Sequence, residues 1–143
     1  MTTPNNKPDP LRILLVDDSP QSLKMTTRML HDMGTTQVFT AKNGVEALQL
    51  LSSFDDEDIV DLVLCDWNMP KMDGMELLRQ IRTCEPDLLF IMVTGQANYS
   101  AVAEAKAFGV NGFIKKPFSL DELRKKLKVA SRIIAHRNPE PVA

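Results

Sequence analysis

The sequence of 143 residues contains few cysteines, a single tryptophan, a single tyrosine and no long apolar run. Its two cysteines, Cys65 and Cys84, form neither a Cys-x-x-Cys pair nor a cluster with histidine, which argues against a structural zinc site. No apolar stretch approaches the length of a membrane span, and the first residues lack the apolar segment of a secretory signal. We therefore expect a cytoplasmic protein that does not associate with membranes.

The charge and length of the chain limit its class further. A formal net charge of −2 provides no general attraction to nucleic acid, so we expect no nucleic-acid partner. The length suffices for one domain with its own hydrophobic core, but not for two ordinary domains. Prolines predict loose tails at residues 1–10, where the tail should be disordered, and at residues 138–143. One folded domain is expected over residues 11–137.

Five apolar segments have the length and composition of β-strands. Residues 11–16, 62–65 and 88–93 are continuous apolar runs, as expected for strands that are covered on both faces. Residues 37–40 and 112–114 are weaker strand candidates, and segments with helical spacing follow each strand. This strict alternation predicts an α/β fold, in which helices cover both faces of a doubly wound, five-stranded parallel sheet.

Capping residues support the predicted helices. Ser19, Asn43 and Ser119 each open a helical segment; a proline follows Ser19, and Glu122 stands three residues after Ser119, as in a capping box. Gly34 is placed to end the first helix. The apolar faces predicted for the first, second and last helices are Leu23, Thr27 and Leu30; Val45, Leu48 and Leu51; and Leu120, Leu123 and Leu127.

Polar residues stand at the ends of four predicted strands. Asp17 and Asp18 end the first strand, Asp66 the third, Thr94 the fourth and Lys116 the fifth. Taken alone, each has an ordinary structural explanation as a helix-terminal charge or a turn residue. Asp66 is the exception, because a charge between Cys65 and a tryptophan is costly without a function. Parallel sheets bind ligands at the carboxyl ends of their strands, so we expect these side chains to meet there.

The combination of these residues predicts a metal-assisted phosphoryl site. Three carboxylates in one pocket repel each other and are tolerable when a cation lies among them. Oxygen ligands favour Mg²⁺ or Ca²⁺ over zinc, and Mg²⁺ readily bridges carboxylates to phosphate. Lys116 would add a second positive charge, and the Thr94 hydroxyl a hydrogen-bond donor. The Asp66 carboxylate could then act as a nucleophile and form an acyl phosphate.

Four sequence motifs resemble those of the receiver domain of two-component response regulators, and the likeness extends over residues 11–130. DWNMPKMDG at 66–74 resembles the phosphorylation loop of the single-domain chemotaxis response regulators. LLVDDS at 14–19, MVTG at 92–95 and KPF at 116–118 resemble the other three motifs, in the family's order. The resemblance implies a flavodoxin-like sheet with strand order 2-1-3-4-5.

The resemblance also implies a role for each site residue. Asp66 would be the phosphoacceptor. Asp18 and Asp66 would bind Mg²⁺ directly, Asp17 would assist, and the Asn68 backbone carbonyl would be a further ligand.

The switch and pairing residues follow from the same motifs. Thr94 would be the switch hydroxyl, and Lys116 would pair with the phosphoryl group. Phe113 stands where the chemotaxis protein has tyrosine, so its ring could still rotate but would offer no hydroxyl to a partner. Gln96 replaces an acidic residue of the chemotaxis protein, at a position thought to tune acyl-phosphate lifetime.

The implied function is that of a stand-alone response regulator. A sensor histidine kinase would phosphorylate Asp66, and the fourth helix, fifth strand and fifth helix, roughly residues 98–130, would bind a downstream protein. Chemotaxis is one candidate pathway. The alternative is a phosphorelay intermediate that passes its phosphoryl group to a histidine phosphotransfer protein. We expect a monomer that catalyses only its own phosphorylation and dephosphorylation.

Two other classes of protein share part of this pattern. Haloacid-dehalogenase-like phosphatases also use an aspartate nucleophile with Mg²⁺, but their signature is Asp-x-Asp after the first strand, where this chain has adjacent Asp17 and Asp18. A flavin-binding module would need a phosphate cradle at that loop, and the two aspartates would repel the flavin phosphate. A scaffold that has lost phosphorylation would not need the complete set of site residues. A phosphorylation switch is therefore the favoured interpretation.

Overall fold

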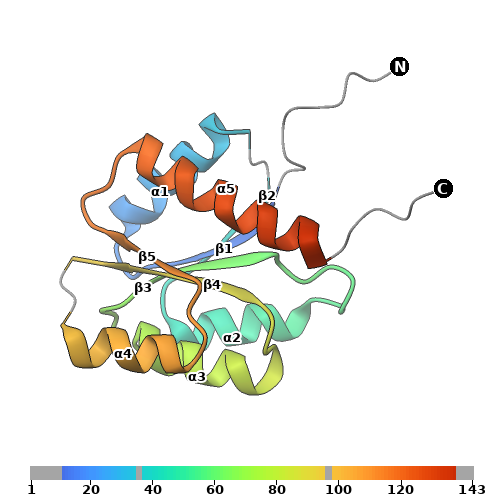
Figure 1. Ribbon diagram of the computed structural model, residues 1–143, viewed down its shortest axis with the longest axis vertical. Helices are drawn as coiled ribbons and strands as arrows, with labels where there is room; N and C mark the ends of the chain where they lie inside the picture. Colours follow the sequence, from blue (N-terminus) through green and yellow to red (C-terminus); the bar gives the residue numbers. More distant parts are fainter. Residues whose placement is uncertain (1–10, 35–36, 96–97, 138–143) are drawn as a thin grey trace.

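The computed structural model describes residues 11–34, 37–95 and 98–137, and within them five strands alternate with five helices (Figure 1). The tails predicted at residues 1–10 and 138–143 lie outside the described residues, as does Gln96. The elements are β1 (Arg12–Val16), α1 (Pro20–Asp32), β2 (Gln37–Ala41), α2 (Gly44–Ser53), β3 (Leu62–Asp66), α3 (Gly74–Cys84), β4 (Leu89–Thr94), α4 (Tyr99–Ala107), β5 (Gly112–Lys115) and α5 (Leu120–Arg137).

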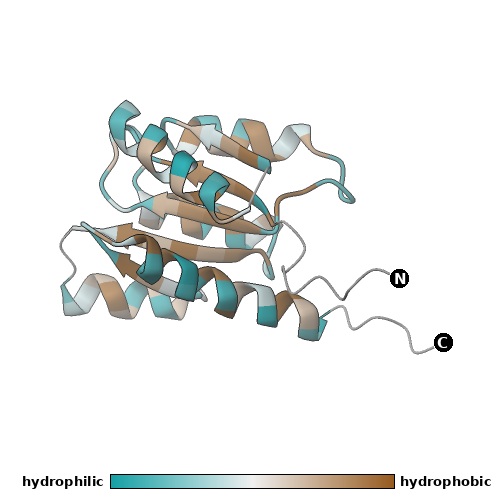
Figure 2. Ribbon diagram, turned by 90° about the horizontal axis from the view of Figure 1, so that it is seen from above, coloured by the Kyte–Doolittle hydropathy of each residue, from teal (hydrophilic) through white to brown (hydrophobic). Residues whose placement is uncertain are grey.

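The strands form one parallel sheet in the order β2-β1-β3-β4-β5, which confirms the predicted doubly wound topology. Helices α1 and α5 cover one face of the sheet, and α2, α3 and α4 cover the other (Figure 1). Figure 2 shows the apolar strands enclosed between helices whose hydrophilic residues face outward. Strands β2 and β5 form the edges of the sheet. Strands β1 and β3 are neighbours inside it, so their polar ends lie side by side.

Two hydrophobic clusters, one on each face, account for the continuous apolar runs in the strands. In β1, Leu14 and Val16 belong to the cluster under α2 and α3, whereas Ile13 and Leu15 belong to the cluster under α1 and α5. Successive side chains of a strand point to opposite faces, so a strand covered on both sides needs apolar residues at every position. All of β4 is buried for the same reason.

The predicted caps are present at three helices. Oxygen atoms of the Ser19, Asn43 and Ser119 side chains accept backbone N–H bonds at 3.2, 2.9 and 3.1 Å. At Ser119 the capping-box geometry differs from the prediction, because the Glu122 carboxylate accepts from the serine hydroxyl (3.3 Å) rather than from the backbone. Gly34 follows α1 with a φ of +94°, a conformation that favours glycine.

Two of the predicted helix faces were partly wrong. In α1, Thr26 is buried and the predicted Thr27 is only half-buried. In α2, Val45 is 41% exposed, and Ala47 packs in the core instead. In both helices the packing against the sheet selects a residue one or two positions from the predicted one, which apolar spacing alone does not distinguish.

Arg82 joins the end of α3 to the corner between α4 and β5. Its guanidinium donates to the carbonyl oxygens of Phe108 (2.8 Å), Gly109 (2.8 Å) and Leu88 (2.7 Å). Gly109 has a φ of +75°, and a Cβ there would lie 3.3 Å from Arg82 Nε. A second link between the same helices is the ion pair of Arg79 with Glu104. The C-terminal end of α4 is therefore held against α3.

Candidate functional site

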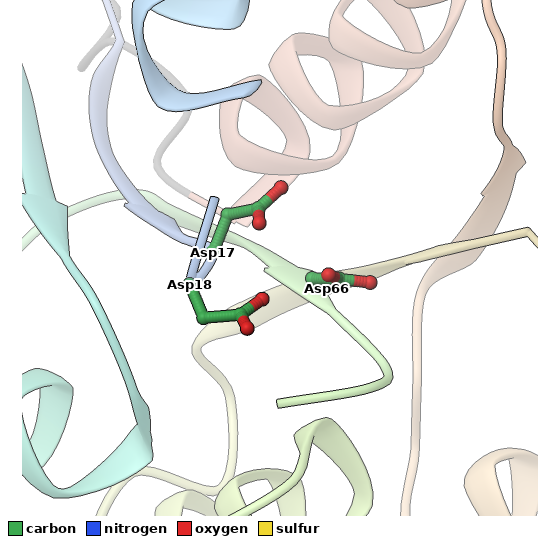
Figure 3. Close-up of side chains that lie close together, drawn as sticks. All are labelled: Asp17, Asp18 and Asp66. Atoms are coloured by element: carbon green, nitrogen blue, oxygen red, sulfur yellow. The ribbon is translucent and has the colours of Figure 1, made fainter. Parts of the chain in front are cut away.

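Three carboxylates meet at the carboxyl ends of β1 and β3 (Figure 3). Val16 of β1 pairs with Cys65 of β3, so the residues that follow, Asp17 and Asp66, emerge beside each other. One carboxylate oxygen from each of Asp17, Asp18 and Asp66 lies within 4.8 Å of the others. Asp17 is buried and Asp18 is exposed, whereas the Asp66 side chain is 12% exposed. The cluster therefore opens to solvent on the Asp18 side.

Lys116, which directly follows the edge strand β5, brings a positive charge to the same carboxylates. Its Nζ lies 2.9 Å from Asp17 Oδ2 and 3.5 Å from Asp66 Oδ2. The Lys116 backbone N–H donates to the Thr94 carbonyl (2.8 Å), which fixes the chain after β5 against the end of β4. The neighbouring Lys115 is exposed. Only the lysine next to the proline thus reaches the carboxylates.

The electrostatics of the metal-free site are unfavourable for the ionised form of Asp66. Burial raises the pKa of the Asp66 carboxyl, the charge of Lys116 lowers it in part, and the charge of Asp17 raises it again. Burial lowers the pKa of Lys116, but its hydrogen bond to Asp17 and the charge of Asp66 outweigh that effect and raise it overall. The ammonium group therefore stays charged and offsets only part of the carboxylate repulsion.

The backbone around Asp66 is tightly constrained. Trp67 N–H donates to the Val93 carbonyl (2.9 Å), and Gly74 N–H donates to the Trp67 carbonyl (2.9 Å), which folds the loop between them back on itself. A Cβ at Gly74 would lie 2.6 Å from the Asp66 carbonyl oxygen, so only glycine fits there without displacing backbone. The Asp66 side chain is thus held on a rigid support.

The two predicted switch residues lie on the side of the site toward β5. Thr94 ends β4 and is buried. Phe113 of β5 pairs in register with Met92 of β4, and its ring stacks on Trp67 with centroids 6.1 Å apart and an interplanar angle of 21°. The sequence does not reveal this ring contact, because residues 67 and 113 come from distant segments without a shared motif. The residue next to Asp66 in the chain is therefore in ring contact with Phe113.

The donor set fits a hard divalent cation. The clustered ligands are all carboxylate oxygens, and the opening on the Asp18 side leaves room for the water ligands that Mg²⁺ retains. Both Asp17 oxygens already accept hydrogen bonds, one from Ser19 N–H (2.9 Å) and one from Lys116 (2.9 Å). Asp17 therefore suits an assisting role. The Asn68 backbone lowers the pKa of the Asp66 carboxyl in part, and the Asn68 carbonyl remains a predicted ligand.

Comparisons with known proteins identify the family of the chain. A sequence model of the response regulator receiver domain matches residues 13–128. The chain is 37% identical over 126 residues to chemotaxis protein CheY-3 of Vibrio cholerae, covering 86% of this chain and 94% of the relative. It is 36% identical to chemotaxis protein CheY of Pseudomonas aeruginosa over 126 residues, covering 86% and 98%.

Solved structures show the same architecture. A CheY-like receiver domain protein of Methanospirillum hungatei superposes with a TM-score of 0.81 at 29% identity, covering 89% of this chain and 98% of that one. CheY of Borrelia burgdorferi, solved as a CheX-CheY-BeF3-Mg²⁺ complex, gives a TM-score of 0.78 at 26% identity, covering 87% and 97%. The family match spans most of the residues that build the sheet and all the clustered carboxylates. The chain therefore belongs to the response regulator receiver domain family.

Proposed function

We propose that this protein is a stand-alone response regulator, in which Asp66 accepts a phosphoryl group and the resulting acyl phosphate controls binding to another protein. The observation that supports the proposal most strongly is the position of Asp66. Its carboxylate lies within 4.8 Å of two other carboxylates and 3.5 Å from Lys116 Nζ, at the solvent-open end of the sheet.

The proposed chemistry is an in-line phosphoryl transfer to a carboxylate. An Asp66 oxygen attacks the donor phosphorus and forms a new P–O bond, while the bond from phosphorus to the donor breaks and leaves its electron pair on the donor. Asp18 and Asp66, with help from Asp17, would hold Mg²⁺, and the bound ion would supply charge neutralisation at the phosphoryl oxygens. Lys116 provides the second positive charge, already placed beside Asp66.

The proposed switch uses Thr94 and Phe113. The Thr94 hydroxyl moves toward the new phosphoryl group, and Phe113 turns in response, which alters the surface formed by α4, β5 and α5. Phosphorylation then shifts the population between two arrangements of that surface. The stacking of Phe113 on Trp67 supports a mechanical link from the acceptor residue to β5.

The proposed partners are a sensor histidine kinase as donor and a downstream protein as target. The chemotaxis relatives favour chemotaxis as the pathway. The proposal also includes that the protein is cytoplasmic, is a monomer and turns over no external substrate. No helix among the described residues is long and apolar enough to cross a membrane.

The acceptor assignment is tested with acetyl phosphate and Mg²⁺, followed by intact-mass measurement. The wild-type protein should gain one phosphoryl group per chain, and Asp66→Asn should gain none. Asp56→Asn is the matched control, because it removes the same charge from an exposed residue of the loop that precedes β3, at the other end of the strand from the site. Labelling of Asp66→Asn at the wild-type rate would overturn the acceptor assignment.

A further inference from the structure

A small cavity lies directly behind the carboxylate cluster, between the sheet and helices α1 and α5. Its volume is about 10 Å³, which is room for about one water molecule. Four of the residues that line it are polar: Asp17, Thr26, Asp66 and Lys116. A cavity of this size stays dry when its walls are apolar, but it holds a water when two to four polar partners are available. The cavity therefore has the properties of a water site.

Of the four polar residues that line the cavity, Thr26 is the one without a role in the proposed phosphoryl chemistry. It lies in the middle of α1 and is only 9% exposed. The hydroxyls of Ser52, Ser53 and Thr83 each bond a carbonyl of the preceding turn, whereas the described residues show no such bond for Thr26. Arg12 Nε is the fully enclosed side-chain polar atom without a partner among the described residues, so the Thr26 oxygen keeps some accessible area. Because Thr26 lines the cavity, a water there can supply the partner that buried hydroxyl groups in proteins almost always have.

Lys116 also lines the cavity, and it has hydrogen-bond donors that need acceptors. An ammonium group has three N–H donors. One is directed to Asp17 (2.9 Å), and the contact with Asp66 is longer (3.5 Å). Among the described residues no other side chain accepts from this ammonium. The Lys116 side chain is 29% exposed, so a donor remains for solvent or for a water in the cavity.

We propose that the cavity binds a structural water that accepts from Lys116 Nζ and donates to the Thr26 hydroxyl. Thr26 is then a positioning residue, which acts on the phosphoryl site through this water and through Lys116. The water holds the ammonium between Asp17 and Asp66, where the proposed transfer needs it. The existence of the water site stands on the cavity and its lining, whereas its effect on labelling rests on the proposed function.

Three substitutions separate the hydroxyl from the packing of this side chain. Thr26→Val keeps the size and branching of threonine and removes the hydroxyl. Thr26→Ser keeps the hydroxyl and removes the methyl group. Thr27→Val makes the same chemical change at the next residue of α1, which does not line the cavity. All three are made in the full chain, and their urea unfolding midpoints are measured alongside.

The first experiment is a high-resolution crystal structure of the metal-free wild-type protein and of Thr26→Val. We expect wild-type density for a water within hydrogen-bond distance of Thr26 Oγ1 and Lys116 Nζ, and loss or displacement of that density in Thr26→Val. An empty wild-type cavity overturns the proposal. An unchanged water in Thr26→Val overturns the role of Thr26.

The second experiment measures the rate of labelling by acetyl phosphate. A water-mediated bond to a charged group predicts a loss of about three- to tenfold for Thr26→Val, with near wild-type rates for Thr26→Ser and Thr27→Val. An equal loss in Thr26→Ser and Thr26→Val would show that packing is responsible, and a wild-type rate in Thr26→Val would remove the positioning role. If the wild-type protein takes no label, the proposed function fails, while the crystal structures still decide the water site.

Discussion

Replacing Asp66 with asparagine should stabilise the metal-free protein, even though it removes the proposed acceptor. The ionised Asp66 carboxylate lies within 4.8 Å of ligand oxygens of Asp17 and Asp18 and 3.5 Å from the Lys116 ammonium. At an effective dielectric constant of about 20, each like-charged pair at that separation costs about 3 kcal/mol, and the attraction to Lys116 contributes about 5 kcal/mol. Two repulsions thus exceed one attraction, and burial of Asp66 adds to the excess.

The expected gain is smaller than the Coulomb difference suggests. Asp18 is exposed, so solvent screens its repulsion of Asp66. We therefore expect Asp66→Asn to increase the free energy of unfolding by about 1–2 kcal/mol, equivalent to a rise in Tm of roughly 3–8 °C for a domain of this size. The assay is thermal unfolding in chelator, with Asp56→Asn as the control of equal charge change. Mg²⁺ should reduce or reverse the difference, because it stabilises the wild-type protein by binding to its folded state.

The pH dependence gives an independent check on the same reasoning. Because the pKa of Asp66 is raised in the folded protein, the folded state holds this proton to a higher pH than the unfolded chain. In the metal-free wild-type protein, stability should therefore fall as the pH rises from the ordinary aspartate range through the raised pKa. The gain from Asp66→Asn should be small at the acid end and complete above that pKa. A variant that is less stable than wild type in chelator at neutral pH would refute the electrostatic account.

Two further predictions concern the metal and the loop behind Asp66. Mg²⁺ should change the fluorescence of Trp67, which adjoins Asp66, and Asp18→Asn should weaken the titration; a flat wild-type titration would contradict a metal site here. Gly74→Ala should lower the free energy of unfolding by about 1–3 kcal/mol in urea titrations, since its Cβ would press on the Asp66 carbonyl; an unchanged midpoint would show that the loop adjusts freely.

The sheet and the acidic cluster could be predicted because both follow from local signals. Apolar runs mark strands covered on both faces, and parallel strands deliver the residues after their ends to one edge. The proximity of Asp17 and Asp66 therefore required only the sheet topology. Their distances to Lys116 required the observed backbone, because a lysine side chain can reach several neighbours from the end of β5.

The orientation of the helices and the long-range contacts could not be predicted from the sequence, for physical reasons. Thr26 and Thr27 are both compatible with the apolar spacing of α1, and only the angle at which the helix packs on the sheet decides which one is buried. The contacts of Arg82 with Phe108 and Gly109 join residues 26 and 27 positions apart and end on backbone carbonyls, which every residue possesses. No pattern of residues in the sequence predicts a hydrogen bond of this kind.

The fastening of α4 by Arg82 and Arg79 has a mechanical consequence for how a signal could leave the acceptor site. Because the last turn of α4 is bound to α3, we expect the helix to tilt about that end, which would move its first turn, at Tyr99, the furthest. Nine residues make a lever about 13 Å long, and a tilt of roughly 10° moves its free end by about 2 Å. Tyr99 is 97% exposed and lies at that end, so a protein bound there would contact the part of α4 that is displaced most.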